Sequence, residues 1–277
     1  MIGSNPFAEL SSLISPSSMQ TYVVIMIAAV VVGVMLDLIH KKSATYFFEN
    51  AEKAKQNRKR DLDDSEKMSI AIQTVLVDVL TSGEFNNQNR RLAHMLKMLG
   101  FVTFVITTII LIFSEQASSM VAVLWHVGAA MVTVGGSWFW FTMRVNGSSE
   151  GQPWTTVVKG DAFILSLVGT TFFGLVWSFL QSSGSNLTMM AFSLFLISST
   201  LLFGGVRWSK FAHMFFKPAA AYQKRIAKAD GSNENLPELG SLTDPDLQKR
   251  YPDIPEYMGS NPPNMGLGIK REAPKHY

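Results

Sequence analysis

Residues 161–207 read DAFILSLVGTTFFGLVWSFLQSSGSNLTMMAFSLFLISSTLLFGGVR, and only the first and last of them, Asp161 and Arg207, are charged. The polar run QSSGSN at 181–186 divides this stretch into two apolar segments. Each is close to the ~20 residues that a helix needs to cross ~30 Å of hydrocarbon. We therefore predict two membrane-spanning helices, at about 162–180 and 187–208.

Three further segments meet the same criterion, at about 22–39, 94–114 and 120–143. Hydrophobic residues make up 47% of the 277-residue chain and charged residues only 16%. The sequence therefore predicts an all-α integral membrane protein with five transmembrane helices. Before the first span only Glu9 is charged, so the basic region of a cleavable signal peptide is missing and this span is expected to stay in the mature protein.

Basic residues are concentrated on one side of the predicted spans. Ten Lys and Arg residues lie between His40 and Ala93 and eleven from Arg207 onward, whereas the three segments on the other side carry none. Because basic flanks stay in the cytoplasm, we expect the N-terminus outside and the C-terminus inside, in the inner membrane. The chain then divides into a membrane domain, 1–226, with a cytoplasmic loop at 40–93, and an extended cytoplasmic tail, 227–277.

The cytoplasmic loop carries the signature of an amphipathic helix. The run Asp63-Asp64-Ser65-Glu66 resembles a capped helix start, and Gly83 is a plausible stop. An apolar stripe follows, which lies either on the membrane or a partner, or against the protein's own helices. The tail, rich in Pro, Asn and Gly, is either disordered or laid along another protein. The stripe consists of Met68, Ile72, Val75, Val79 and Leu80.

The absence of cysteine excludes thiolate-bound iron–sulfur clusters and cysteine zinc sites in this chain, so a redox centre would have to use histidine. Two imidazoles can hold one haem iron if they approach from opposite faces at similar depth, and His94 and His213 meet this condition at the inner ends of spans two and five. The alternative for either is an interfacial histidine. One difficulty is depth, because a continuous helix from Leu187 would place His213 about 39 Å along its axis; His40 is the substitute ligand.

Basic residues and glycines around these two histidines are also compatible with a haem. The basic side chains could pair with the haem propionates, and the glycines would leave room for a flat ring near the backbone. The candidate propionate partners are Arg90, Arg91, Arg207 and Lys210, and the glycines are Gly100, Gly204 and Gly205.

Two motifs resemble a known superfamily. The run RWSKFAHMFFKP at 207–218 resembles the end of the last membrane helix in the gamma subunit of respiratory nitrate reductase and its relatives. The run NRRLAHMLKMLGF at 89–101 resembles the second helix of the same superfamily, which includes membrane subunits of heterodisulfide reductases. Together they cover about 25 residues, and within the superfamily the chain looks most like the membrane anchor of adenylylsulfate reductase.

The resemblance implies specific roles. It implies that His94 and His213 ligate one haem b near the cytoplasmic face, whereas Phe104 and Phe195 stand where nitrate reductase members carry the ligands of a second haem. It also implies a cytoplasmic flavin and iron–sulfur oxidoreductase as partner, in sulfur metabolism. The implied role is an electron-transfer subunit of a respiratory chain, which receives electrons from sulfite oxidation with AMP and passes them to the quinone pool.

The quinone site is less defined by the sequence. Asp37 with His40 is one candidate for proton uptake, and Glu115 with His126 is another on the outer side. The alternative for His126 is a hydrogen-bonded polar residue between helices. Nothing indicates a nucleic-acid partner, while the basic loops would hold an acidic protein surface and anionic lipids. A haem-free membrane anchor and a small-solute transporter are the rival functions, although no inverted repeat supports a transporter.

Overall fold

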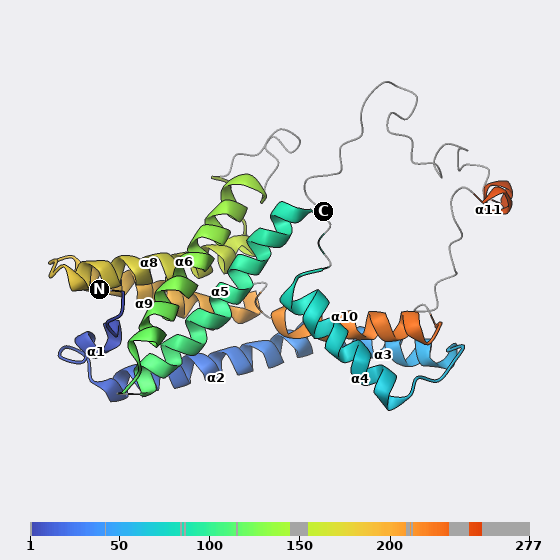
Figure 1. Ribbon diagram of the computed structural model, residues 1–277, viewed down its shortest axis with the longest axis horizontal. Coiled ribbons are helices and arrows are strands. Elements are labelled where there is room, and N and C mark those ends of the chain that lie inside the picture. Colours follow the sequence, from blue (N-terminus) through green and yellow to red (C-terminus); the bar gives the residue numbers. More distant parts are fainter. Residues whose placement is uncertain are drawn as a thin grey trace, which may run out of the picture.

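The computed structural model describes residues 2–41, 43–83, 85, 87–114, 116–144, 155–208, 211, 213–232 and 244–250. All regular secondary structure in these ranges is helical. Long helices form a bundle on one side of the molecule, and shorter helices gather at one end of it (Figure 1). The main helices are α1 (Pro6–Leu10), α2 (Pro16–Lys41), α3 (Ser43–Gln56), α4 (Asp64–Gln73), η1 (Thr74–Leu80), α5 (Gln88–Phe113), α6 (Ser119–Thr142), η2 (Lys159–Asp161), α8 (Ala162–Ser182), α9 (Thr188–Gly204), η3 (Val206–Trp208), α10 (His213–Ala229) and α11 (Pro245–Arg250).

Four helices are long and apolar enough to cross a membrane: α2, α5, α6 and α8 with its preceding turn. The fifth predicted span corresponds to α9, a shorter apolar helix of 17 residues. Many large apolar side chains of these helices are exposed, including Val31, Met35, Val134 and Phe172. Since lipid tails can cover such side chains, the chain has the features of a multi-pass membrane protein.

The helices pack as two hairpins, α5 with α6 and α8 with α9, which meet where α6 contacts α8. Gly100 shows how closely the first pair packs: a Cβ built there would lie 2.7 Å from the Cβ of Met131 and 2.8 Å from the carbonyl oxygen of Gly128. Small residues allow membrane helices to approach in this way. The space beside Gly100 is therefore filled by α6, and the expectation that this glycine makes room for a flat cofactor ring is wrong.

The chain bends where the sequence predicted one continuous helix. α9 ends at Gly204, and a Cβ on Gly205 would lie only 2.4 Å from the carbonyl oxygen of Leu201, so a glycine is needed there. A short turn, η3, follows, and a new helix, α10, begins at His213. Because His213 opens a separate helix, the 39 Å path along a single axis does not apply.

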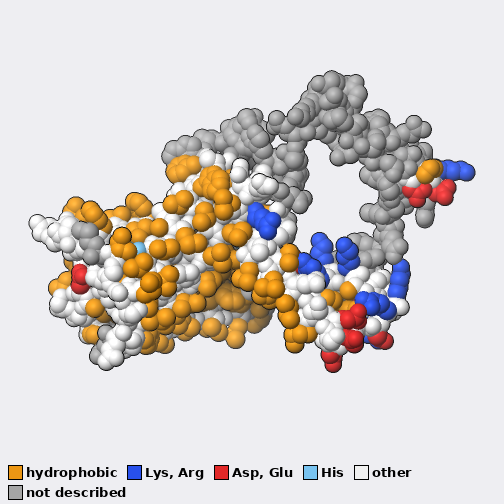
Figure 2. Space-filling view, viewed as in Figure 1, with side chains coloured by type: hydrophobic (Ala, Val, Ile, Leu, Met, Phe, Trp, Pro, Cys, Tyr) orange, Lys and Arg blue, Asp and Glu red, His pale blue; other side chains and the backbone are white. Residues whose placement is uncertain are grey.

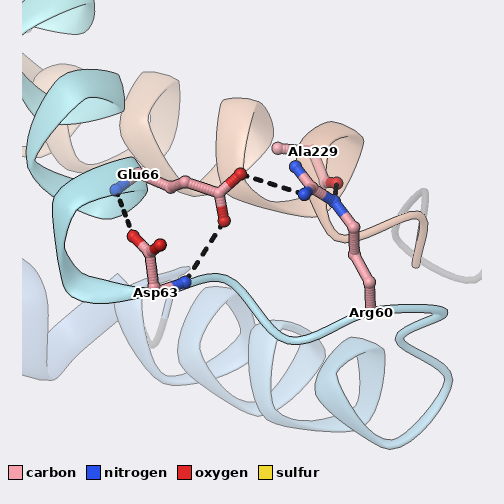
Figure 3. A network of polar contacts seen from close by, with 4 residues as sticks. All are labelled: Arg60, Asp63, Glu66 and Ala229. Atoms are coloured by element: carbon pink, nitrogen blue, oxygen red, sulfur yellow. Dashed lines mark hydrogen bonds and ion pairs between the residues drawn. The ribbon is translucent and has the colours of Figure 1, made fainter.

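We call α3, α4, η1 and α10 the polar helical group, since they pack together beyond the long helices. Charged side chains gather over this group, while the visible face of the long helices is mostly hydrophobic (Figure 2). Figure 3 shows the contact that closes its far end. Arg60 Nε donates to the carbonyl oxygen of Ala229 at 2.8 Å, and its NH1 lies 2.9 Å from Glu66 Oε1, so the α3–α4 connection is fixed to the end of α10.

The predicted start of the loop helix is confirmed. Asp63 is the N-cap of α4 and accepts from the Glu66 N–H at 2.7 Å, while the Asp63 N–H donates to the Glu66 carboxylate at 3.2 Å. The backbone hydrogen bond from Glu66 lowers the pKa of the Asp63 carboxyl. Of the apolar stripe, Met68, Ile72, Val75 and Leu80 are exposed and Val79 is half-buried.

An ion pair joins η1 to α10 at the near end of the polar helical group. Arg225 Nε donates to Asp78 Oδ2 at 2.6 Å and NH2 to Oδ1 at 2.9 Å, which is the two-pronged arrangement that guanidinium favours. The hydrogen bond from Arg225 lowers the pKa of Asp78 below its ordinary value of 3.8, and Asp78 in turn raises the pKa of Arg225. The pair thus holds the helix that begins at His213 against the segment that leads into α5.

We predict that Asp78→Asn lowers the stability of the protein by about 1 kcal/mol, measured by thermal unfolding in detergent, while Asp64→Asn, which removes a fully exposed partner of Lys67, has no effect. Because the folded-state pKa of Asp78 is lowered, its contribution is complete above pH 3.8 and is lost as the pH falls through the lowered pKa. Equal melting temperatures for both variants and wild type would show that the pair does not hold α10.

Candidate functional site

The candidate site is built around His94, in the second turn of α5, where the apolar bundle meets the polar helical group. The Oγ of Ser82 lies 2.8 Å from His94 Nδ1, and the rings of Phe85 and His94 are 4.9 Å apart. Histidines that ligate metals are generally held at one ring nitrogen by a second group, which fixes the ring and its tautomer. Ser82 holds one ring nitrogen of His94 in a comparable way. The imidazole is half-buried.

Ser82 is an unusual residue for its position. It is fully buried, and its φ of 50° lies in the left-handed region, where glycine is the common residue. It follows η1, which is a π-helix, a form that occurs often at functional sites. Among the described residues Ser82 alone is a non-glycine with positive φ. The backbone thus adopts a sparsely populated conformation at the residue that holds His94.

The start of α10 is directed to the same face of α5 by neighbouring contacts. His94 and Phe101 are seven residues apart and share a helix face. The ring of Phe101 lies 6.0 Å from that of Phe211, which is buried two residues before His213. The structure describes the backbone of His213 but not its side chain. His94 and His213 are therefore on segments that meet at one end of the bundle.

The four basic candidates have different surroundings. Arg90 NH2 donates to the carbonyl oxygen of Met143 at 3.2 Å, and its Nε is buried without a hydrogen-bond partner among the described atoms. Arg91 Nε donates to the carbonyl oxygen of Thr81 at 2.6 Å, and Arg207 is exposed. Lys210 lies outside the described residues. Arg90 is thus the candidate with an unused donor.

Two further features of this end of the bundle were given no role from the sequence. Lys97 lies one turn beyond His94 on α5, with its Nζ 3.9 Å from the centre of the Phe139 ring. Arg144 forms a buried ion pair with Asp161, and its guanidinium lies 4.2 Å from the Trp140 ring centre. The placement of Arg91, His94 and Lys97 at intervals of three was visible in the sequence, but their partners on α6 were not.

The quinone candidates do not form one site in the described residues. Asp37 is buried near the end of α2, whereas His40, one turn later, is exposed. Glu115 lies outside the described residues. His126 lies in the other half of the bundle, where Nδ1 donates to the carbonyl oxygen of Ala122 at 2.7 Å and Nε2 lies 2.8 Å from Ser178 Oγ. These contacts match the alternative interpretation of His126 as a hydrogen-bonded residue between helices.

Phe104 and Phe195 lie in an aromatic core in that half of the bundle. The Phe104 ring is 5.2 Å from that of Trp125, and the Phe195 ring is stacked 5.6 Å from that of Trp177. The core also contains Phe7 of α1 and Phe192 of α9. Side chains therefore fill the region between the helices at this level.

The residues near His94 fit a haem better than a bare metal ion. Within the described ranges no three His, Cys, Asp or Glu side chains come together as ligands for an ion. A haem needs only two imidazoles and acceptable partners for its carboxylates. The Nδ1 contact of His94 suits one such imidazole, and the buried Nε of Arg90, which has no partner among the described atoms, suits a carboxylate; the side chain of His213 lies outside the described residues.

Comparisons with protein-family models, curated proteins and solved structures found no match to this chain.

We predict that Ser82→Ala and Ser82→Gly differ in stability. Alanine removes the hydrogen bond to His94, worth about 1 kcal/mol, and keeps the left-handed backbone. Glycine removes the same bond but relieves a backbone cost of roughly 1 kcal/mol. Thermal unfolding in detergent should place Ser82→Ala below wild type and Ser82→Gly close to it. An alanine variant as stable as wild type would contradict the contact.

Proposed function

We propose that this chain is a membrane cytochrome b subunit that transfers electrons between a cytoplasmic oxidoreductase and the quinone pool, and that His94 and His213 hold one haem b. The observation that carries the proposal is the hydrogen bond between Ser82 and His94 at the junction of the bundle and the polar helical group. The contact between Phe101 and Phe211 supports the second ligand, because it directs the start of α10 to the face of α5 that carries His94.

In this proposal the haem, when bound, supplies the one-electron chemistry, and the protein supplies ligation, orientation and charge. Ser82 fixes the His94 ring, and the ion pair between Asp78 and Arg225 holds α10 against η1. Arg90, with its buried unused N–H, is the first choice to receive a propionate, and Arg91, Arg207 and Lys210 remain further candidates. A cation beside the propionates favours the reduced haem, because it balances the negative charge that the added electron brings.

A single haem is favoured over two. A second haem would need two more ligands and space in the other half of the bundle. Phe104 and Phe195 occupy the relevant neighbourhoods and pack against Trp125 and Trp177. His126, the remaining histidine there, is engaged with Ala122 and Ser178, although it remains a candidate for a quinone contact.

The proposed topology has five spans, with α9 as the fifth, in the inner membrane. In favour of it, α9 packs along α8 and also contacts α2, so it belongs to the bundle despite its length. At 1.5 Å per residue its 17 residues extend about 25 Å, slightly less than the ~30 Å hydrocarbon layer. The clustering of Lys and Arg in the polar helical group supports placing that end in the cytoplasm.

The soluble partner would dock on the polar helical group. The exposed stripe formed by Met68, Ile72, Val75 and Leu80 ends two residues before Ser82, so a protein bound there would lie beside the proposed haem. The best candidate for the partner is adenylylsulfate reductase, a flavin and iron–sulfur enzyme, on the strength of the sequence resemblance. Quinone is then the second substrate of the complex, with Asp37, His40, Glu115 and His126 as candidate contacts.

The test is the absorption spectrum of the purified, reduced protein. We predict a haem b alpha band that is lost in His94→Ala and in His213→Ala. His126→Ala is the matched control and should keep the band, because it removes an imidazole in the other half of the bundle. His40→Ala should keep the band as well, and its loss there would identify His40, the substitute ligand, in place of His94 or His213. A colourless wild-type protein after expression with ample haem would leave a haem-free anchor as the better interpretation.

A further inference from the structure

Arg90 and Lys97 place two positive charges on one face of α5, one turn on either side of His94. Both side chains reach the end of α6. Arg90 donates to the carbonyl oxygen of Met143 at 3.2 Å, and the Nζ of Lys97 lies over the ring of Phe139, one turn before Met143. Because Gly135 lies against the backbone of Lys97, the lysine side chain must run along α6 toward its end.

These two cations lack a carboxylate partner in the described part of the chain. Asp161, the acidic side chain at this end of α8, is already engaged by Arg144, in a pair with only 9% and 12% of the two side chains exposed. Among the described atoms, the buried Nε of Arg90 has no acceptor, and neither has NH1 of Arg144. A buried N–H without an acceptor is uncommon in native proteins, and each such group calls for a partner.

The C-terminal end of α6 can stabilise part of the positive charge of Arg90 and Lys97, but not all of it. Carbonyl groups at the C-terminus of a helix carry a partial negative charge of about half an elementary charge. Met143 accepts one N–H of Arg90 in this way. Two full positive charges exceed that partial charge, and the Nε of Arg90 is not used by it.

We propose that Arg90 and Lys97 form a binding site for one oxyanion at the junction of α5 and α6. Two sources can supply such a group at a membrane boundary: the phosphate of an anionic phospholipid and a haem propionate. Basic groups between membrane helices on the cytoplasmic side are a known setting for anionic headgroups. Guanidinium binds phosphate and carboxylate alike by charge-assisted hydrogen bonds, and an ammonium adds a second charge.

The lipid source is tested with the full-length protein in detergent, stripped of lipid and titrated with phosphatidylglycerol or phosphatidylcholine under native mass spectrometry. If the oxyanion is a lipid phosphate, phosphatidylglycerol binds at least tenfold more tightly than phosphatidylcholine. Arg90→Gln and Lys97→Met each remove that preference. Lys97→Arg keeps it, and Lys159→Gln, which removes an exposed cation at the start of η2, leaves it unchanged. This measurement needs no haem, so its outcome does not depend on whether the proposed function is correct.

The propionate source is tested on the haem-loaded protein by redox titration. If the oxyanion is a propionate, the lipid preference is the same in wild type and all variants. Arg90→Gln and Lys97→Met then lower the midpoint potential of the haem, because each removes a positive charge beside it. Lys159→Gln leaves the midpoint potential unchanged. Circular dichroism melts verify that the variants are folded. Folded variants that change neither the lipid preference nor the potential would overturn the proposed site.

Discussion

The hydrogen bond between Ser82 and His94 links two parts of the molecule that differ in polarity and in packing. On one side is an apolar bundle packed through glycines and aromatic rings, and on the other is a charged group of short helices. A polar side chain at such a boundary needs a defined partner, because water and lipid both fail to satisfy it fully. The left-handed backbone of Ser82, the π-helix before it and the ion pair that braces η1 against α10 all place this one hydroxyl.

The distribution of polar groups along the bundle supports one functional end. In the half near α1, His126 and Trp125 are satisfied by short contacts within the bundle, to Ala122, Ser178 and Thr108. In the same half Trp177 Nε1 is buried without a partner among the described atoms, and so are Arg90 Nε and Arg144 NH1 at the other end of the bundle. The two charged side chains among these three lie at the end near the polar helical group, where an anionic ligand would supply the missing acceptor.

Much of the fold could be predicted from the sequence because its signals are local. Apolar runs identified the helices that can cross a membrane, and the Asp63 to Glu66 spacing identified the start of α4. The bend after Gly204 was missed because a glycine pair in an apolar run is compatible with a continuing helix, and the steric conflict at Gly205 appears only once the turn is built.

His94 could be singled out from the sequence as a candidate, but its surroundings could not. His94 stood out as an ionisable residue at the edge of an apolar run, whereas Ser82 has no sequence signal that distinguishes it from other serines in loops. Its role depends on a backbone conformation and on the packing of η1 against α10. Gly100 illustrates the opposite error: the sequence shows a small residue, but only the structure shows that α6 occupies the space beside it.

The proposal that two imidazoles share one iron is tested by low-temperature electron paramagnetic resonance of the oxidised protein. The account predicts a low-spin ferric signal typical of two histidine ligands in wild type, converted to a high-spin signal in a His213→Ala protein that retains some haem. A high-spin wild-type signal, or a low-spin signal unchanged by His213→Ala, would contradict it.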